Sequence, residues 1–353
     1  GEKIFGRSTD GFDALHDQDR VLRDPGSPVI VPHLADTLQN IADNGGNSFY
    51  RGDIAAAIVK HVAAGGGRLS ARDMGEYRAI PRAPLMSELA GWQIASNPPP
   101  AIGGAVLSAL LGAVRREPHG HWTGQSLLEM IRVQQTVLAY RRDRLDLCDD
   151  IESACAELLS DPDPAVTPGP WVSSSTVHTS AVDSLGNACA ITASSGYGSG
   201  EMPAGTGLWL NNCLGELELN RRGLEAGPPG RRLPSNMTPG AARKGDRVLA
   251  FGSPGADRIT TALQQFLVNF MHRGMSLGDA IAAPRLHVTI TEKGATLAAE
   301  PGIPVSDSTM PVTLYPALNM YFGGVGAALY SATDGFAANA DPRRAGGTTI
   351  AGK

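Results

Sequence analysis

Apolar residues in the first half of the chain recur every three or four positions, the spacing of a helix with one buried face. The pattern runs from His33 to Ala64, with a break at residues 44–47, and returns over residues 126–147. Ser70 and Asp73 have the spacing of a helix cap and predict a short helix through Tyr77. The first half of the chain is therefore predicted to be mostly helical.

Two segments in this half differ in their pattern. Residues 92–97 are expected to form a strand, which Pro98-Pro99-Pro100 ends. Gly103-Gly104 then opens a further helix that continues into Leu111.

Residues 160–175 are rich in Pro, Gly, Ser and Asp, the composition of an extended, exposed connector that is easily cut. After it, apolar and polar residues alternate, and residues 179–182 and 188–193 predict a hairpin around a turn at 183–187. We expect another strand at Leu208–Leu210 and helices over residues 263–270 and 277–281. The chain thus divides into a helical part, residues 1–175, and a strand-led part, residues 176–353.

Composition narrows the class of protein. The 353 residues carry a formal net charge of −5, which argues against a nucleic-acid partner or an anionic membrane surface, because both need a basic face. No run of 18 apolar residues is present, so no membrane-spanning helix is predicted. The four cysteines lack Cys-x-x-Cys spacing, which argues against structural zinc, and a disulfide framework is not expected in so long a chain. The compartment, cytoplasmic or exported, stays open.

Thr176 directly follows the connector and is the candidate nucleophile. A threonine hydroxyl is a poor nucleophile unless a nearby base accepts its proton. Cleavage of the peptide bond before Thr176 would create that base on the same residue, because an α-amino group has a pKa near ~7.7–8.0. The tetrapeptide Ser175-Thr176-Val177-His178 by itself is weak evidence for this role, because on its own it favours a solvated loop that leads into a strand.

Longer motifs surround this tetrapeptide in a fixed order. They are Phe49-Tyr50-Arg51-Gly52-Asp53-Ile54-Ala55, Asn97-Pro98-Pro99-Pro100 with Gly103-Gly104, Thr176-Val177-His178-Thr179-Ser180-Ala181-Val182-Asp183 with Gly186-Asn187-Ala188, Gly198-Ser199-Gly200, Gly205-Thr206-Gly207, Leu210-Asn211-Asn212, Arg232-Leu233-Pro234-Ser235-Asn236-Met237-Thr238-Pro239, Gly252-Ser253-Pro254-Gly255 and Ala340-Asp341-Pro342-Arg343-Arg344. In order and spacing they resemble the γ-glutamyltranspeptidase family of N-terminal-nucleophile hydrolases.

The resemblance implies an α+β fold, a four-layer αββα sandwich. It also implies autocatalytic cleavage before Thr176 into a large and a small subunit from one precursor. Thr176 would attack the γ-carbonyl of a small-molecule γ-glutamyl donor such as glutathione, and water or an amine would accept the acyl group. No cofactor or metal is implied, and a homo-oligomer stays open.

The resemblance also assigns roles to individual positions. The backbone of Gly255 and Ala256 stands where the family has a Gly-Gly pair of oxyanion donors. Ser235 and Asn236 stand at a Ser-Ser pair that binds the substrate α-carboxylate, and Glu216 stands at an acid that pairs with the α-ammonium group. A solvated carboxylate is the alternative interpretation of Glu216.

Several positions depart from the family pattern. Val177 replaces a threonine, and Ser194 is expected to supply the hydroxyl that supports the nucleophile. The stretch between Glu216 and Ser235 is short, so a lid loop over the site is not expected. An Asp-Gly-Arg-Glu type segment, whose arginine binds the substrate carboxylate in the family, is not found, and the family's N-terminal portion is expected to be lacking.

These departures leave two alternatives open. One is another amidase of the same superfamily, such as a cephalosporin or glutaryl acylase or an oxamate-type amidohydrolase. The other is a relative that is not processed and not catalytic. His119 and His121 have no ligand partner at metal-binding spacing, and His178 is expected to serve in packing or positioning rather than as a general base.

Overall fold

The computed structural model describes residues 2–114, 124–160, 176–216, 220, 223, 227–291 and 294–351. The chain forms two compact units, the first made of Gly1–Pro81 and Ser195–Cys213, the second of Arg82–Ser194 and Leu214–Lys353. Residues 161–175, which make up nearly all of the predicted connector, lie outside the described residues, as do His119 and His121. The division at residue 176 concerns peptide cleavage rather than packing, and it stays a prediction.

The first unit is helical. Its helices are α1 (Glu2–Phe5), α2 (Thr9–Leu15), α3 (Leu34–Asn44), α4 (Asn47–Arg51), α5 (Asp53–Ala64) and α6 (Ala71–Glu76). The predicted helical run and its break are confirmed. So is the cap of α6, where the Ser70 hydroxyl accepts from the N–H of Asp73 and the Asp73 carboxylate accepts from the N–H of Ser70.

The strand predicted at Leu208–Leu210 is wrong, because this segment of the first unit is irregular. Leu208 and Leu210 pack against a small apolar cluster on α5 and α6 that contains Ile54, Ile58 and Met74. The N–H of Leu210 donates to the carbonyl of Glu201 in a loop. The apolar residues of this segment pack on helices, and a short apolar pattern does not distinguish such packing from pairing in a sheet.

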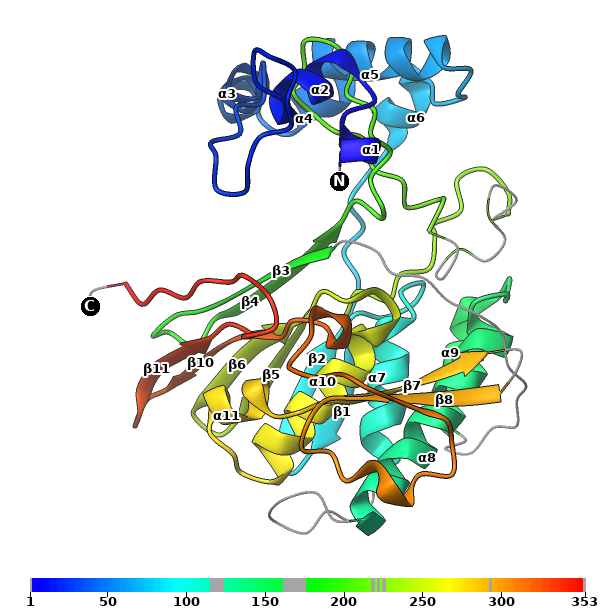
Figure 1. Ribbon diagram of the computed structural model, residues 1–353, viewed down its shortest axis with the longest axis vertical. Coiled ribbons are helices and arrows are strands. Elements are labelled where there is room, and N and C mark those ends of the chain that lie inside the picture. The colour runs from blue at the N-terminus through cyan, green and yellow to red at the C-terminus, as the bar shows by residue number, and fades with distance from the viewer. Residues whose placement is uncertain are drawn as a thin grey trace. The chain divides into compact units, whose positions relative to one another are not determined.

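A six-stranded antiparallel sheet forms the centre of the second unit (Figure 1). In spatial order its strands are β1 (Leu85–Leu89), β2 (Trp92–Ser96), β5 (Gly240–Lys244), β6 (Arg247–Gly252), β10 (Gly326–Ser331) and β11 (Gly335–Asn339). The predicted strand at residues 92–97 is confirmed as β2.

Helices α7 (Gly103–Gly112) and α10 (Ile259–Leu267) cover one face of this sheet. The rings of Phe251 on β6 and Phe266 on α10 lie 6.4 Å apart, and those of Trp92 on β2 and Phe270 lie 5.7 Å apart. Phe270 belongs to a π-helical turn (Val268–His272) that continues α10. Burial of these aromatic side chains is the main source of stability for the layer.

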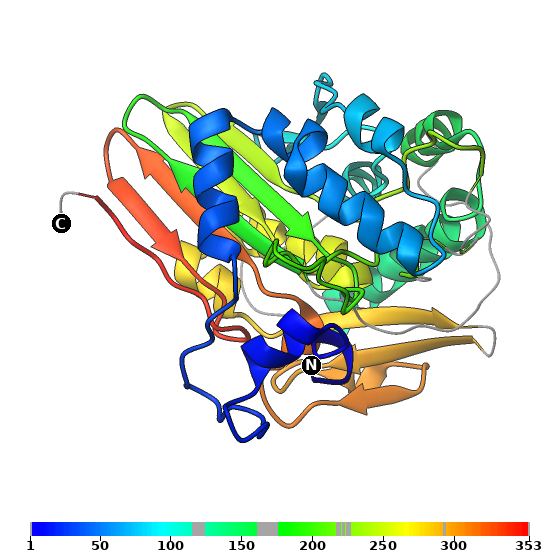
Figure 2. The ribbon, with the colours of Figure 1, turned by 90° about the horizontal axis from the view of Figure 1, so that it is seen from above.

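The opposite face of the sheet carries a two-stranded hairpin, β3 (Thr176–Val182) and β4 (Ala188–Ser194), which lies over β6 and β10 (Figure 2). The hairpin confirms the prediction and extends it by three residues at its start. Val182 pairs with Ala188 and Thr176 with Ser194, so the first residue of β3 is directly opposite the last residue of β4.

The remaining elements of the second unit surround this core. They are α8 (Gly124–Tyr140), a π-helical turn (Arg141–Leu145), α9 (Ile151–Ser160), α11 (Leu277–Ala282), β7 (Leu286–Thr291), β8 (Gly294–Ala299), β9 (Val312–Leu314) and the 3-10 turns Ala256–Arg258, Val305–Asp307 and Met320–Phe322. Strands β7, β8 and β9 form a separate sheet, in which β7 and β8 are antiparallel.

A buried glutamine ties this second sheet to the helices. The Gln134 side chain on α8 donates to Gln264 on α10 and accepts from the N–H of Val288 on β7. Helices and mostly antiparallel sheets thus share the core of the second unit, and the predicted α+β class is confirmed.

Candidate active site

Thr176 is the first described residue after the gap at 161–175, and it lies buried at the start of β3. Its Oγ1 donates a hydrogen bond of 3.3 Å to the Oγ of Ser194. The antiparallel register produces this contact, because directly opposed side chains on one face of a hairpin lie within reach of each other. Ser194 therefore stands where a hydroxyl that supports Thr176 is expected.

His178 follows on the same face of β3 and lies between the hairpin and the central sheet. Its Nδ1 is 2.8 Å from the Oγ1 of Thr192 and its Nε2 is 2.7 Å from the Oγ of Ser180. A Cβ added at Gly252, the last residue of β6, would lie 2.3 Å from the His178 ring, so glycine is required for this packing. Burial lowers the pKa of His178 to about 4, which keeps the imidazole neutral at neutral pH.

The loop after β6 carries the predicted oxyanion donors. Pro254 leads into Gly255 (φ +135°) and Ala256 (φ +52°), both buried, and a 3-10 turn and α10 follow. Gly255 has no room for a side chain, because a Cβ would lie 2.8 Å from the Cα of Gly323. Within the described part of the chain, neither Gly255 N–H nor Ala256 N–H donates a hydrogen bond. Two buried donors at the start of a helix are the arrangement that stabilises a developing negative charge.

Ser235 and Asn236 lie where their segment meets the start of α7. The carbonyl of Ser235 accepts from the N–H groups of Ile102 and Gly103, and its Oγ accepts from the N–H of Met237. Asn236 is fully buried, and its Nδ2 donates to the carbonyl of Ala256 at 2.6 Å. This brings Asn236 to the loop that carries the predicted oxyanion donors, whereas its contact with a substrate carboxylate stays a prediction.

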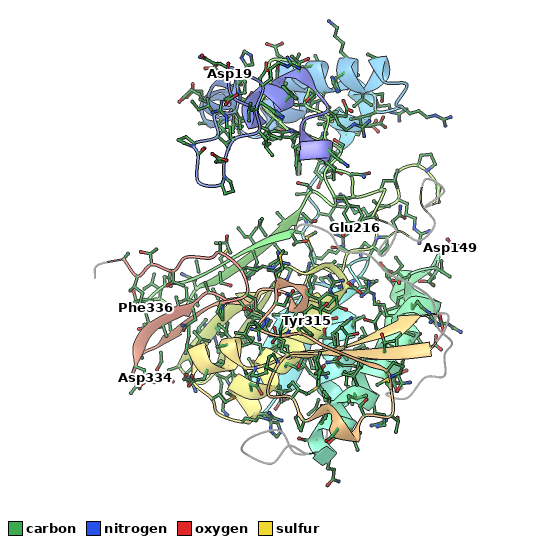
Figure 3. The ribbon with its side chains drawn as sticks, in the orientation of Figure 1. Asp19, Asp149, Glu216, Tyr315, Asp334 and Phe336 are labelled. Atoms are coloured by element: carbon green, nitrogen blue, oxygen red, sulfur yellow. The ribbon has the colours of Figure 1, made fainter. Side chains whose placement is uncertain are left out.

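Glu216 is 3% exposed and belongs to the second unit (Figure 3). A carboxylate buried to this degree is not the solvated surface group of the alternative interpretation, because burial of a charge requires partners. Its pairing with a substrate ammonium group stays a prediction. Residues 217–219, 221, 222 and 224–226 lie outside the described residues, so the absence of a lid also stays a prediction.

Thr176 lines a cavity of about 1130 Å³ within the second unit. Its walls also include Pro254, Gly324, Phe336 and Arg344. The Arg344 side chain donates to the carbonyl oxygens of Gly323 and Met320 at 3.3 Å each. Burial lowers the pKa of Arg344, with the nearby Arg258 guanidinium adding to the effect. The cavity thus brings a cationic side chain and the predicted nucleophile to one space.

A buried group of four charges holds the segment that carries Arg344. Arg343 pairs with Glu300 and with Asp341, and Arg285 pairs with the other oxygen of Asp341 at 2.7 Å. All four side chains are at most 2% exposed. Because each charge has an opposite partner and further hydrogen bonds, the group fixes the wall of the cavity beside Gly324.

Among the described residues, no group of three or more His, Cys, Asp or Glu side chains is arranged to hold a metal ion. In the same part of the chain no helix has the length and apolar character needed to cross a membrane.

The structure brings together Thr176 with Ser194 and Asn236 with Ala256. The sequence analysis did not predict that Arg344 lines the cavity, although this residue lies in one of the quoted motifs. It also did not predict the contact between Asn236 and Ala256. Two adjacent arginines in a Gly-rich tail were the available signal for the first. No local pattern indicates the second.

The chain is similar to known proteins in sequence and in fold. The family model described as Gamma-glutamyltranspeptidase matches residues 3–351. The glutathione hydrolase proenzyme of Escherichia coli (strain K12) is 30% identical over 74% of this chain and 51% of its own length, and that of Pseudomonas sp. (strain A14) is 31% identical over 74% and 52%. The chain therefore spans about half the length of these relatives.

A crystal structure of cephalosporin acylase from Bacillus halodurans shares the fold, with a TM-score of 0.78 and 23% identity over 97% of this chain and 66% of that one. The predicted sandwich fold of the N-terminal-nucleophile hydrolases is confirmed, with its second sheet represented in the described residues of the second unit by the β3–β4 hairpin. The match of the family model over nearly the whole chain shows that this protein belongs to the γ-glutamyltranspeptidase family.

Proposed function

We propose that the protein is an acyltransferase or hydrolase of γ-glutamyl amides that uses Thr176 as its nucleophile after cleavage of the preceding peptide bond. The observation that carries the proposal is the position of Thr176, at the start of β3, hydrogen-bonded to Ser194 and lining a large cavity. A nucleophile at a strand start suits this chemistry, since cleavage there leaves its α-amino group beside its own hydroxyl.

The reaction follows from these groups. The Oγ1 of Thr176 attacks the γ-carbonyl carbon of the donor, and its proton passes to the α-amino nitrogen of the same residue. The N–H groups of Gly255 and Ala256 stabilise the oxyanion that forms. The α-ammonium group returns the proton to the leaving amine, which departs and leaves a threonyl ester. Water or an acceptor amine then attacks this ester and releases the acyl group.

Substrate recognition is assigned to charged and polar groups of the second unit. Glu216 pairs with the α-ammonium of the donor and Ser235 with its α-carboxylate, as the family resemblance implies, whereas the Nδ2 of Asn236 is engaged by the carbonyl of Ala256. Arg344 adds positive charge to the cavity and favours a donor or acceptor that carries a carboxylate. The two subunits of one precursor are the partners in this proposal.

One observation favours a second candidate, an amidase for donors that lack the amino-acid head group. The Nδ2 of Asn236 is already bonded to Ala256, so half of the predicted carboxylate site is engaged within the protein. A donor whose acyl group lacks the α-carboxylate would need fewer contacts there, whereas a glutaryl amide keeps this carboxylate and lacks only the α-amino group that Glu216 would bind.

The first experiment is the intact mass of the purified protein, with Thr176→Ala and Thr179→Ala as matched variants. Thr179 lies exposed on the same strand, so its substitution tests strand β3 without touching the nucleophile. We expect two fragments in the wild type and in Thr179→Ala, the smaller beginning at Thr176, and one uncut chain in Thr176→Ala. A wild-type protein that stays uncut would instead support a relative that is neither processed nor catalytic.

The second experiment separates the two substrate classes. Release of chromophore from a γ-glutamyl anilide is compared with release from a glutaryl anilide, which keeps the carboxylate and lacks only the α-amino group. A clear preference for the γ-glutamyl compound, lost in Glu216→Gln, supports the first candidate. Equal rates on both anilides favour the second.

A further inference from the structure

The conformation of Ala256 is unusual for a residue with a side chain. Its φ of +52° lies in the left-handed region, where the Cβ of an L-residue crowds its own backbone. Ala256 is also 1% exposed, so no solvent contact offsets the strain. Something in the surrounding structure must therefore hold the residue in this conformation.

Asn236 provides a contact of the required kind. Its Nδ2 donates to the carbonyl oxygen of Ala256 at 2.6 Å, a short hydrogen bond between fully buried groups. A carbonyl can only accept, so the nitrogen of the amide must face Ala256 and the oxygen must point away from it. The carbonyl of Ala256 also accepts from the N–H of Ile259, which fixes the peptide unit after Ala256 from a second side.

Asn236 is itself held by the start of α7. Its carbonyl accepts from the Oγ1 of Thr238 at 2.9 Å. A Cβ at Gly103 would lie 2.2 Å from Thr238 Oγ1 and 2.5 Å from the carbonyl oxygen of Asn236, so the segment packs directly on the backbone of the helix. The backbone of Asn236 is therefore held in place by α7 and Thr238, and this fixes the position from which its side chain reaches Ala256.

We propose that Asn236 is a positioning residue, which holds Ala256 in its left-handed conformation and so keeps the N–H of Ala256 directed at the oxyanion. The inference rests on the proposed function, because it concerns the oxyanion donors of that reaction. The tethered carbonyl belongs to the peptide unit after the Ala256 Cα, and the N–H belongs to the unit before it. While the carbonyl holds the peptide unit after Ala256 in place, relaxation of φ at Ala256 to a negative value would rotate the preceding peptide unit. Its N–H would then turn away from the oxyanion.

This arrangement leaves the oxygen of the Asn236 side-chain amide without a hydrogen-bond partner in the described structure. This oxygen, Oδ1, is buried. Asn236→Ser removes the hydrogen bond to Ala256 and at the same time removes this unpaired acceptor, two effects on folding of opposite sign. The melting temperature is therefore expected to change little, whereas the conformation of the loop depends on the lost bond.

The test is a pair of matched comparisons on a γ-glutamyl anilide. Asn236→Ser is made in the wild type and again in Ala256→Gly, because glycine adopts positive φ without a side-chain penalty and needs no tether. We expect Asn236→Ser to lower kcat about ten-fold in the wild type and no more than about two-fold in the glycine background, with KM changed less than about two-fold in both. Asn236→Ala is expected to behave like Asn236→Ser and serves if the serine variant does not fold.

Two kinetic outcomes overturn the proposal. An equal fall of kcat in both backgrounds means that Asn236 does not act through Ala256. A rise in KM with kcat unchanged means that Asn236 contacts the substrate carboxylate instead. Asn44 is an exposed asparagine of the first unit, and Asn44→Ser is the control for the same substitution outside the second unit. This variant is expected to leave kcat and KM unchanged.

A crystal structure of Asn236→Ser keeps this inference separate from the proposed function. A negative φ at residue 256 supports the tether, and a φ that stays near +52° overturns it, whether or not the protein turns over any amide. A wild-type protein that is inactive on every amide tested refutes the proposed function and leaves this backbone measurement valid.

Discussion

Substitution of Glu300 by glutamine is expected to destabilise the second unit strongly. Glu300 is fully buried, and its two carboxylate oxygens accept from the Arg343 guanidinium, from the N–H of Asn319 at 2.8 Å and from the N–H of Arg285 at 2.9 Å. Glutamine keeps the size of the side chain but loses its charge. It also turns an amide N–H₂ toward groups that are themselves donors.

The magnitude follows from the charges left behind. In the wild type, Arg285 and Arg343 face Asp341 and Glu300, so the buried group is balanced. Without the charge of Glu300, two guanidinium groups share Asp341, and one buried positive charge is uncompensated. Breaking a buried pair from one side typically costs about 3–5 kcal/mol. At roughly 2–4 °C per kcal/mol for a unit of this size, the melting temperature should fall by about 10 °C.

Differential scanning calorimetry measures this shift, with Glu88→Gln as the matched control. Glu88 is exposed on β1, and its substitution should change stability by less than about 0.5 kcal/mol. The double variant Glu300→Gln with Arg343→Met removes the uncompensated charge and should recover part of the loss. A fall for Glu300→Gln no larger than that of Glu88→Gln, or a double variant as unstable as the sum of its parts, would refute the reasoning.

Four further outcomes are expected. Ser194→Ala should lower kcat on a γ-glutamyl anilide about ten-fold with little change in KM, and Ser194→Thr should restore it; a KM effect alone would contradict a supporting role for the Ser194 hydroxyl. Gly252→Ala should cost about 1–3 kcal/mol of stability, because its Cβ would overlap the His178 ring, whereas Gly112→Ala, with nothing within 4 Å of its Cβ, should not. Arg344→Gln should raise KM several-fold for donors that carry a carboxylate and leave neutral amides unaffected, as steady-state kinetics would show. Burial lowers the pKa of His178 to about 4, so as pH falls from 6.5 to 4 the unfolded chain takes up the proton before the folded protein does. The free energy of unfolding should therefore be highest above pH 6.5 and decline by up to about 3 kcal/mol across that window. A pH dependence of the melting temperature that is unchanged in His178→Gln would contradict this.

Local patterns accounted for much of the fold. The helix cap at Ser70 and Asp73, the helix that begins at Gly103 and the hairpin around residues 183–187 all depend on contacts between residues a few positions apart. The structure confirms each of them. Strands β5 and β6 were not predicted, although they pair with each other as a local hairpin around residues 245–246, because their apolar runs are short. Their other partners, β2 and β10, lie far away in the sequence.

The sequence by itself determined the family, the position of the candidate nucleophile and the residue that faces it. A hairpin with a turn at 183–187 has one register that pairs Val182 with Ala188, and the same register places Ser194 opposite Thr176. Because hydrogen bonds repeat regularly along two adjacent strands, the pairing next to the turn also determines the pairing at the far end of the hairpin.

Only the tertiary structure decided how the parts around the nucleophile support it. The bond from Asn236 to Ala256 joins two loops, the pairing of Arg343 with Glu300 joins the tail to the end of β8, and Arg344 reaches the cavity because that tail is held there. No repeated local geometry relates these residues along the chain. Their contacts exist because the packing of α7, α10 and the central sheet brings distant backbone segments within hydrogen-bonding distance.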